Sequence, residues 1–124
     1  MEGYIQTLSG SKVKRYVQTL DISNDPELIA EYRKWHSEEY NWPEIREGIR
    51  QVGILEMEIY ILGNRLVMIV DAPADFDWQE AMDRLATLPR QAEWEALVAR
   101  FQGCSADARS DEKWQPMERM FRLY

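Results

Sequence analysis

One alternating stretch, joined to a second strand by a tight turn, restricts the fold of this chain more than any other feature of its sequence. Residues Ile54–Leu62 alternate apolar and polar side chains, as a strand with one buried face does. Gly63–Asn64 is a hairpin signal, and Arg65–Val70 returns as the next strand. The sequence therefore predicts an antiparallel pair. One face of its first strand would carry Leu55, Met57, Ile59 and Ile61.

Helical patterns precede the hairpin. Asn24 or Asp25 can accept hydrogen bonds from the first amides of a helix, and Pro26 suits its first turn. Pro43 closes this segment, because the residue before a proline is pushed out of the α region. A second short helix is expected over Pro43–Gln51, with Gly53 as its natural C-terminal cap.

Helical patterns also follow the hairpin. A turn over Pro73–Asp77 leads into a helix expected over Trp78–Leu88, and Pro89 restarts the helix. The apolar face of the restarted helix would carry Trp94, Leu97, Val98 and Phe101. A polar loop is expected over Gln102–Lys113, with Cys104 in it.

Strands at the two ends complete the order of elements. Val13–Leu20 is rich in β-branched and aromatic residues and is expected as the first strand. Met117–Tyr124 is expected as the last, and its two faces are both partly apolar, which is typical of a buried strand or an interface. The order β-α-(α)-β-β-α-(α)-β predicts an α+β, ferredoxin-like βαββαβ fold with helices on one face of an antiparallel sheet. The uncovered face predicts a homodimer in which two sheets close face to face.

The length of the chain sets its domain organisation. A chain of 124 residues suits one domain with one modest core. Residues 13–124 are expected to form this domain, and residues 1–12 to form a flexible N-terminal leader. The stretch Tyr4–Leu8 in the leader echoes Tyr16–Leu20, but an echo so short is better explained by chance than by a structural repeat.

Charge and composition limit the partners of the chain. The formal net charge of −7 argues against nucleic-acid binding, which needs a basic face. No segment is long and apolar enough to span a membrane, and the N-terminus lacks the apolar core of a signal peptide. With one cysteine and one histidine, the chain can form no internal disulfide and offers few ligands for zinc. We expect a cytoplasmic protein.

The only histidine of the chain lies at the end of the first predicted helix, among aromatic residues. Tyr32 and His36 are four residues apart, so their side chains would lie on one helix face, one turn above the other. Trp35 and Trp42 are close by in the sequence. Such an arrangement suits either a structural histidine beneath an aromatic core or a sugar site in which an imidazole moves a proton. Both interpretations are open on composition and spacing.

Three short motifs resemble one family. Glu31-Tyr32-x-x-x-His36, then Trp42-Pro43-Glu44-Ile45, then Gly53 with Ile59-Tyr60 resemble the L-rhamnose mutarotase family, including its L-fucose mutarotase branch. The resemblance runs from about Val13 to Tyr124. It implies a dimeric α/β barrel that interconverts the α and β anomers of a 6-deoxyhexose, L-rhamnose or L-fucose, without a cofactor.

The resemblance also assigns individual residues. It implies that His36 is the proton donor and that Tyr32 contacts the sugar. The family's tryptophan pair is matched only at its second position, Trp94, since Glu93 takes the first. Met57 stands at the family's tyrosine contact on the second strand. Further candidates for the sugar site include Trp42, which could equally staple the helix junction.

Two other functions are compatible with the same fold. Ferredoxin-like dimeric barrels also include haem-binding and cofactor-free oxidative enzymes, and a lone helical histidine could be an axial ligand. A non-catalytic sugar-binding module is the third possibility. Glu56 and Glu58 could form a paired-carboxylate site, although charged residues on a strand are more often solvated or paired at an interface.

Overall fold

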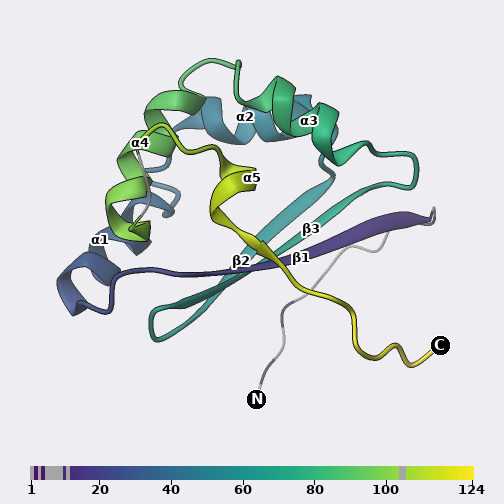
Figure 1. Ribbon diagram of the computed structural model, residues 1–124, viewed down its shortest axis with the longest axis horizontal. Helices are drawn as coiled ribbons and strands as arrows, with labels where there is room; N and C mark the ends of the chain where they lie inside the picture. Colours follow the sequence, from purple (N-terminus) through teal and green to yellow (C-terminus); the bar gives the residue numbers. More distant parts are fainter. Residues whose placement is uncertain (1, 3, 5–9, 11, 104–105) are drawn as a thin grey trace.

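The structure is built on a four-stranded antiparallel sheet. It is a computed structural model and describes residues 2, 4, 10, 12–103 and 106–124. The strands lie in the order β2-β3-β1-β4 (Figure 1). Their bounds are Val13–Asp21 for β1, Glu56–Leu62 for β2, Arg65–Pro73 for β3 and Gln115–Pro116 for β4. This order has the first strand in the interior between the third and the last, as the ferredoxin-like prediction requires.

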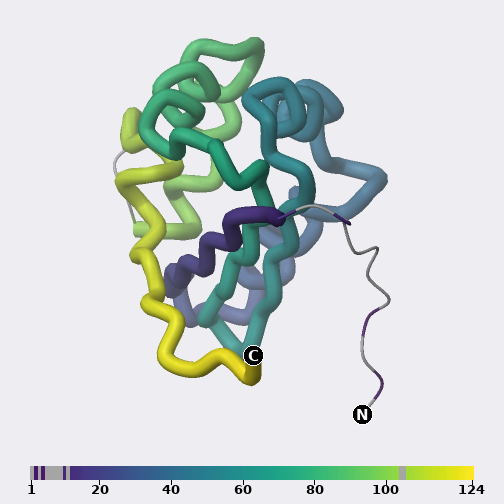
Figure 2. The backbone as a smooth tube through the Cα atoms, turned by 90° about the vertical axis from the view of Figure 1, so that its right-hand side faces the viewer, coloured from purple at the N-terminus to yellow at the C-terminus, as the bar shows by residue number. Residues whose placement is uncertain are grey.

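The helices cover one face of this sheet, as Figure 1 shows and Figure 2 shows from the side. They are α1 (Pro26–Trp35), α2 (Pro43–Gln51), α3 (Trp78–Leu85), α4 (Gln91–Gln102) and the single turn α5 (Ser110–Lys113). The predicted α+β fold, with helices on one face of an antiparallel sheet, is therefore confirmed.

The strand register sends alternate side chains toward the helices. Met68 of β3 pairs with Gln18 of β1 on one side and Ile59 of β2 on the other. The neighbouring inward row joins Tyr16, Val70 and Met57. Along β3, Leu66, Met68, Val70 and Ala72 are buried, whereas the residues between them are only partly covered. The helix-facing side of the sheet is thus the floor of the core.

Local sequence signals determine where the helices begin and end. The carboxylate of Asp25 accepts hydrogen bonds from the amides of Glu27 and Leu28, which starts α1 as predicted. Trp42 is extended in front of Pro43, so α2 starts afresh there. Gly53 follows the end of α2 with φ of 103°, a conformation that favours glycine.

The hairpin and the third helix differ slightly from the prediction. β2 begins at Glu56, not Ile54, and Leu55 lies outside the strand with 57% of its surface exposed. The prediction that Leu55 shares the core face of Met57 is therefore wrong; Ile54 is buried in its place. The helix expected over Trp78–Leu88 ends at Leu85.

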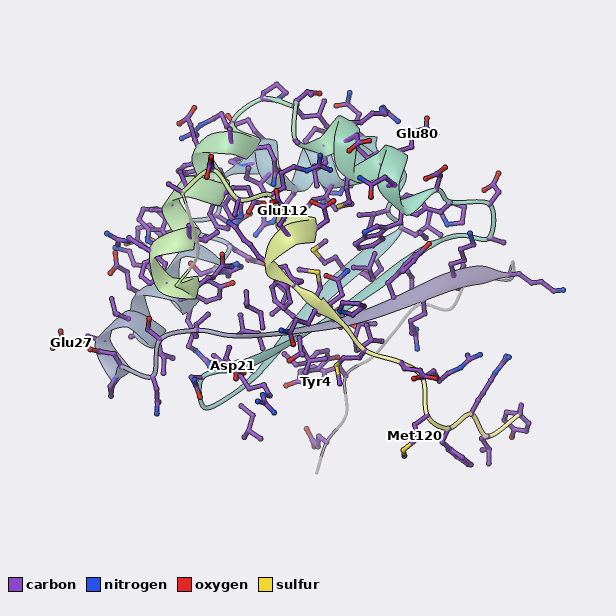
Figure 3. All side chains as sticks on the ribbon, viewed as in Figure 1. Tyr4, Asp21, Glu27, Glu80, Glu112 and Met120 are labelled. Carbon is purple, nitrogen blue, oxygen red and sulfur yellow. The ribbon has the colours of Figure 1, made fainter. Side chains whose placement is uncertain are left out.

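The predicted last strand is wrong. Pairing with β1 is limited to Gln115–Pro116, followed by one further hydrogen bond from the amide of Met117 to the carbonyl of Val17 at 2.7 Å. Beyond it, residues 118–124 form no regular secondary structure. The exposed apolar side chains of this segment include Met120 at 95% and Phe121 at 74% (Figure 3). An apolar pattern alone does not make a strand, because a strand also needs a partner for its backbone.

The segment Gln102–Lys113 is more ordered than the predicted polar loop. It contains α5, and the side chain of Lys113 is fully buried. Cys104 lies outside the described residues, and so do Ile5–Leu8 of the stretch that echoes Tyr16–Leu20. β1 begins at Val13, directly after the stretch expected as a leader.

Candidate active site

A cavity of about 300 Å³ lies between the helix layer and the inner face of the sheet. Its walls combine side chains from β1, β2, β3 and the helices. The polar side chains that line it are Gln18, Tyr32, His36, Asn41, Arg46, Gln91, Glu95, Gln102 and Ser110. The apolar side chains are Ile45, Ile49, Ile54, Met57, Ile59, Met68, Trp78, Met82, Leu85, Trp94, Val98 and Trp114. A mostly apolar chamber with a few polar groups is typical of a small-molecule site.

His36 caps the C-terminal end of α1, and one ring nitrogen is fixed by the helix itself. Its Nδ1 lies 2.8 Å from the carbonyl oxygen of Tyr32. Because a carbonyl oxygen can only accept, Nδ1 carries the hydrogen and Nε2 of the neutral ring keeps a lone pair. Nε2 has no hydrogen-bond partner among the residues that the structure describes. The imidazole therefore offers a proton acceptor from a wall of the cavity.

Burial adjusts the proton affinity of this imidazole. Desolvation lowers the pKa of His36 below the 6.5 of an unperturbed histidine, and the hydrogen bond to the Tyr32 carbonyl opposes this only in part. The neutral ring therefore predominates at neutral pH. A group of this kind can take a proton at working pH and return it within the same reaction.

Tyr32 lies one turn before His36, and the two rings are tilted against each other with centroids 4.4 Å apart. The phenol is buried, with 3% of the residue exposed, and it lines the same cavity. Its oxygen accepts a hydrogen bond from Nε2 of Gln102 at 3.3 Å. Burial raises the pKa of Tyr32 to about 12, so the phenol stays protonated and can still donate its own hydrogen.

Aromatic rings link the histidine to the outer surface. Trp94 of α4 meets His36 edge to face at 5.3 Å and meets Trp42 edge to face at 5.5 Å between centroids. The guanidinium carbon of Arg90 lies 3.7 Å from the centroid of Trp42. Trp42 packs behind Trp94 and does not line the cavity itself. Tyr32, His36 and Trp94, all predicted as site residues, are thus connected by ring contacts through His36.

The other predicted site residues divide into two groups. Met57 lines the cavity from β2, opposite the helices. Glu93 does not: its side chain is 64% exposed and lies 3.6 Å from the guanidinium of Arg90. Glu56 is exposed at the start of β2, and Glu58 accepts a hydrogen bond from the hydroxyl of Tyr60 at 3.2 Å. Neither of these carboxylates lines the chamber.

A buried polar network on α4 was missed by the sequence analysis. Nζ of Lys113 lies 2.5 Å from Oε2 of Glu95, and Nε2 of Gln91 donates to Oε1 of Glu95 at 2.7 Å. Gln91 and Glu95 both line the cavity. The available signal was position: Gln91, Trp94 and Val98 follow one another at helical spacing, so a polar side chain lies on an otherwise apolar face.

Two classes of feature are missing from the described part of the chain. No group of three or more His, Cys, Asp or Glu side chains could hold a metal ion there. None of the described helices is both long and apolar enough to cross a bilayer. The polar groups that line the cavity include hydrogen-bond donors and acceptors and the imidazole of His36, which suits proton transfer on a small polyhydroxylated molecule.

Known proteins resemble this chain over most of its length. Residues 15–123 match the L-rhamnose mutarotase family. An L-fucose mutarotase from Xanthomonas campestris is 39% identical over 111 residues, which cover 90% of this chain and 89% of the relative. A UPF0734 protein from Dictyostelium discoideum is 38% identical over 114 residues, covering 89% of this chain and 90% of that protein.

A solved structure agrees on the fold. The crystal structure of an L-rhamnose mutarotase from Formosa agariphila superposes with a TM-score of 0.65 and covers 90% of this chain and 99% of its own. Its sequence identity of 18% supports the fold alone. The family match and the identity of the curated relatives carry the assignment further: the chain belongs to the L-rhamnose mutarotase family, whose members are enzymes that interconvert the anomers of a sugar.

Proposed function

We propose that this enzyme interconverts the α and β anomers of a 6-deoxyhexose in the cavity beside His36. L-Fucose is the first substrate to test, because the relative at 39% identity is an L-fucose mutarotase, and L-rhamnose is the second, because the family model describes an L-rhamnose mutarotase. The single observation that supports this site best is the imidazole of His36, with Nδ1 held by the helix and Nε2 left to the cavity.

The reaction needs one proton to move between two oxygens of the sugar. Neutral Nε2 of His36 takes the proton of the anomeric hydroxyl and delivers it to the ring oxygen as the bond between C1 and the ring oxygen breaks. Both oxygens are bonded to C1, so one nitrogen can serve them in turn. The open-chain aldehyde rotates about the C1–C2 bond and recloses on its other face, with the proton returned in reverse.

The neighbouring side chains would bind and orient the ring. The protonated phenol of Tyr32 can donate a hydrogen bond to a sugar oxygen, while its own oxygen accepts one from Gln102. Trp94 and Met57 supply apolar walls for the C–H face of the sugar. Trp42 acts from behind, by fixing the ring of Trp94. Glu93 is exposed beside Arg90 in the first turn of α4. It would therefore affect the site only indirectly, through the start of this helix.

Anomer exchange under saturation transfer tests this proposal. Wild-type protein should transfer saturation between the two anomeric protons of L-fucose or L-rhamnose much faster than the free sugar does. His36→Gln should reduce the exchange rate by roughly 10²–10⁴-fold, the usual contribution of an acid/base group, while sugar binding persists. A variant that exchanges as fast as wild type would remove His36 from the mechanism. A wild-type protein that binds but does not exchange would favour the non-catalytic module.

We also propose a homodimer closed over the uncovered face of the sheet. This face carries Val17 and Ile69, which are register partners, and the exposed Tyr60. The C-terminal segment runs away from the helices (Figure 1), and its apolar side chains are exposed. Two such faces could cover one another, as in a pair of packed sheets. For location we propose the cytoplasm; the support is the single cysteine, which leaves no internal disulfide to require an oxidising compartment.

A further inference from the structure

The side-chain oxygen of Gln91 accepts no hydrogen bond in the described part of the chain. Gln91 opens α4, is 5% exposed, and lines the cavity that holds His36. Its Nε2 donates to Oε1 of Glu95 at 2.7 Å. Its Oε1 is buried and has no hydrogen-bond partner in the described part of the chain. Buried polar atoms are almost always paired, so an acceptor left open beside a cavity points to a donor that arrives with a ligand.

A buried ion pair determines which end of this amide is left open. Nζ of Lys113 donates to Oε2 of Glu95 at 2.5 Å and also to the backbone carbonyl of Glu95 at 2.9 Å. The side chains of Lys113 and Glu95 are 0% and 12% exposed. An ion-paired carboxylate only accepts hydrogen bonds, so Gln91 must turn its N–H group to Glu95. Its oxygen is then the atom that remains.

We propose that Oε1 of Gln91 accepts a hydrogen bond from a ring hydroxyl of the sugar, and that the Lys113–Glu95 pair holds the amide in the orientation that makes this possible. Gln91 is then a specificity-determining residue, and Glu95 and Lys113 are positioning residues that act through it. The inference rests on the proposed function in that it takes the ligand of this cavity to be a monosaccharide.

The chemistry of the cavity explains why such an acceptor matters. A sugar that lacks the matching hydroxyl would leave a buried oxygen unpaired, which a site discriminates against more strongly than it does against a missing apolar contact. Next to Gln91 along the helix, Trp94 supplies an apolar wall. The indole of Trp94 then packs against the C–H face of the sugar ring, and the amide of Gln91 accepts a hydrogen bond from one hydroxyl.

Binding of singly deoxygenated sugars tests the role of Gln91. L-Fucose and its 2-, 3- and 4-deoxy analogues are titrated against wild type and Gln91→Met, a variant of similar volume without the acceptor. Wild type should bind one analogue about 2–12-fold more weakly than L-fucose, the range of one neutral hydrogen bond. Gln91→Met should bind L-fucose more weakly by a similar factor and no longer distinguish that analogue. Gln79→Met is the matched control, because Gln79 is exposed on α3, where its side chain donates a hydrogen bond to Asp83, and it does not line the cavity.

The positioning role has its own variant. In Glu95→Gln/Lys113→Met the new amide at position 95 can donate as well as accept, so Gln91 is free to turn its N–H group into the cavity. This variant should keep its melting temperature within a few degrees, raise KM with little change in kcat, and lose the discrimination against the same deoxy sugar. The single variant Lys113→Arg should keep the discrimination, because its guanidinium can still pair with Glu95.

The outcomes separate this inference from the proposed function. Unchanged discrimination among the deoxy sugars in Gln91→Met overturns the inference, and exchange by wild type then leaves the proposed function intact. Binding with discrimination but without anomer exchange overturns the proposed function and leaves the role of Gln91 standing. If wild type binds neither these four sugars nor L-rhamnose, both are overturned.

Discussion

The imidazole of His36 and the indole of Trp94 meet edge to face, with ring centroids 5.3 Å apart. One ring lies at the end of α1 and the other near the start of α4, so the packing of two helices sets the surroundings of the only histidine in the chain. The indole excludes water from one side of the imidazole. Protonation of His36 is therefore resisted by the fold itself.

The first prediction concerns the pKa of His36. Since the chain has one histidine, a single Hε1 resonance reports its titration by NMR. The midpoint should lie below 6.5, and Trp94→Leu should move it upward, because water reaches the ring when the indole is removed. Trp35→Leu, on the same helix as His36 but outside the cavity, is the control. A midpoint at or above 6.5 in wild type would contradict the proposed shielding.

The same lowered pKa predicts how rate and stability depend on pH. If neutral His36 starts the reaction, anomer exchange should be constant at neutral pH and fall as the pH drops through the lowered pKa.

The unfolded chain, with a histidine pKa near 6.5, binds more protons than the folded one between the two pKa values. The contribution of His36 to stability is thus fully present above about pH 6.5 and is lost as the pH falls. His36→Gln should remove this component from urea unfolding measured at several pH values.

The third prediction separates binding from proton transfer at Tyr32. Tyr32→Phe should raise KM by about 2–12-fold, which corresponds to about 0.5–1.5 kcal/mol for one neutral hydrogen bond, and should change kcat much less. Tyr40→Phe is a matched control, because Tyr40 is 42% exposed and does not line the cavity. A loss confined to kcat in Tyr32→Phe would show that the phenol takes part in proton transfer instead.

The site could be predicted where local spacing decides it. Tyr32 and His36 are one turn apart on a helix whose start is marked by Asp25 and Pro26, so their shared face follows from the 3.6-residue period. Trp94 is at helical spacing with Val98 and Phe101, which places it on the buried side of α4. Periodicity does not say which helices meet, and the resemblance to a family supplied the link between α1 and α4.

The rest depended on partners far away in the sequence. Lys113 lies in a stretch of charged residues that reads as solvated, and only its contact with Glu95 explains why the side chain is buried. Gln91 gains its role from the same network. In the C-terminal segment, the apolar pattern of Met120 and Phe121 indicates cover on both sides without naming the partner that provides it. The predicted strand was wrong for this reason.

The fourth prediction concerns that C-terminal segment and the proposed dimer. Wild type should sediment at micromolar concentration with twice the 14.7 kDa mass of the chain. Changing Met120 and Phe121 together to serine should weaken the dimer, because it removes exposed apolar surface that drives association. The dissociated variant should melt at a lower temperature than wild type, and its melting temperature should not depend on protein concentration, because dissociation removes the stabilisation that association adds. A wild-type monomer at this concentration would rule out the dimer.

The last prediction concerns the stability of the Lys113–Glu95 pair. Removing one partner leaves a charge buried without compensation, so Glu95→Leu or Lys113→Met alone should each lower the free energy of unfolding by about 3–5 kcal/mol. Replacing both at once removes the desolvation cost along with the attraction, and Glu95→Leu/Lys113→Met should come within about 1 kcal/mol of wild type or exceed it. Urea unfolding of the four proteins gives the coupling energy as a double-mutant cycle. Single variants that lose as little as Arg15→Met, which breaks the exposed pair with Asp71, would show that Lys113 reaches water in solution. A buried pair predicts the opposite: a large loss for either change alone and recovery when the two are combined.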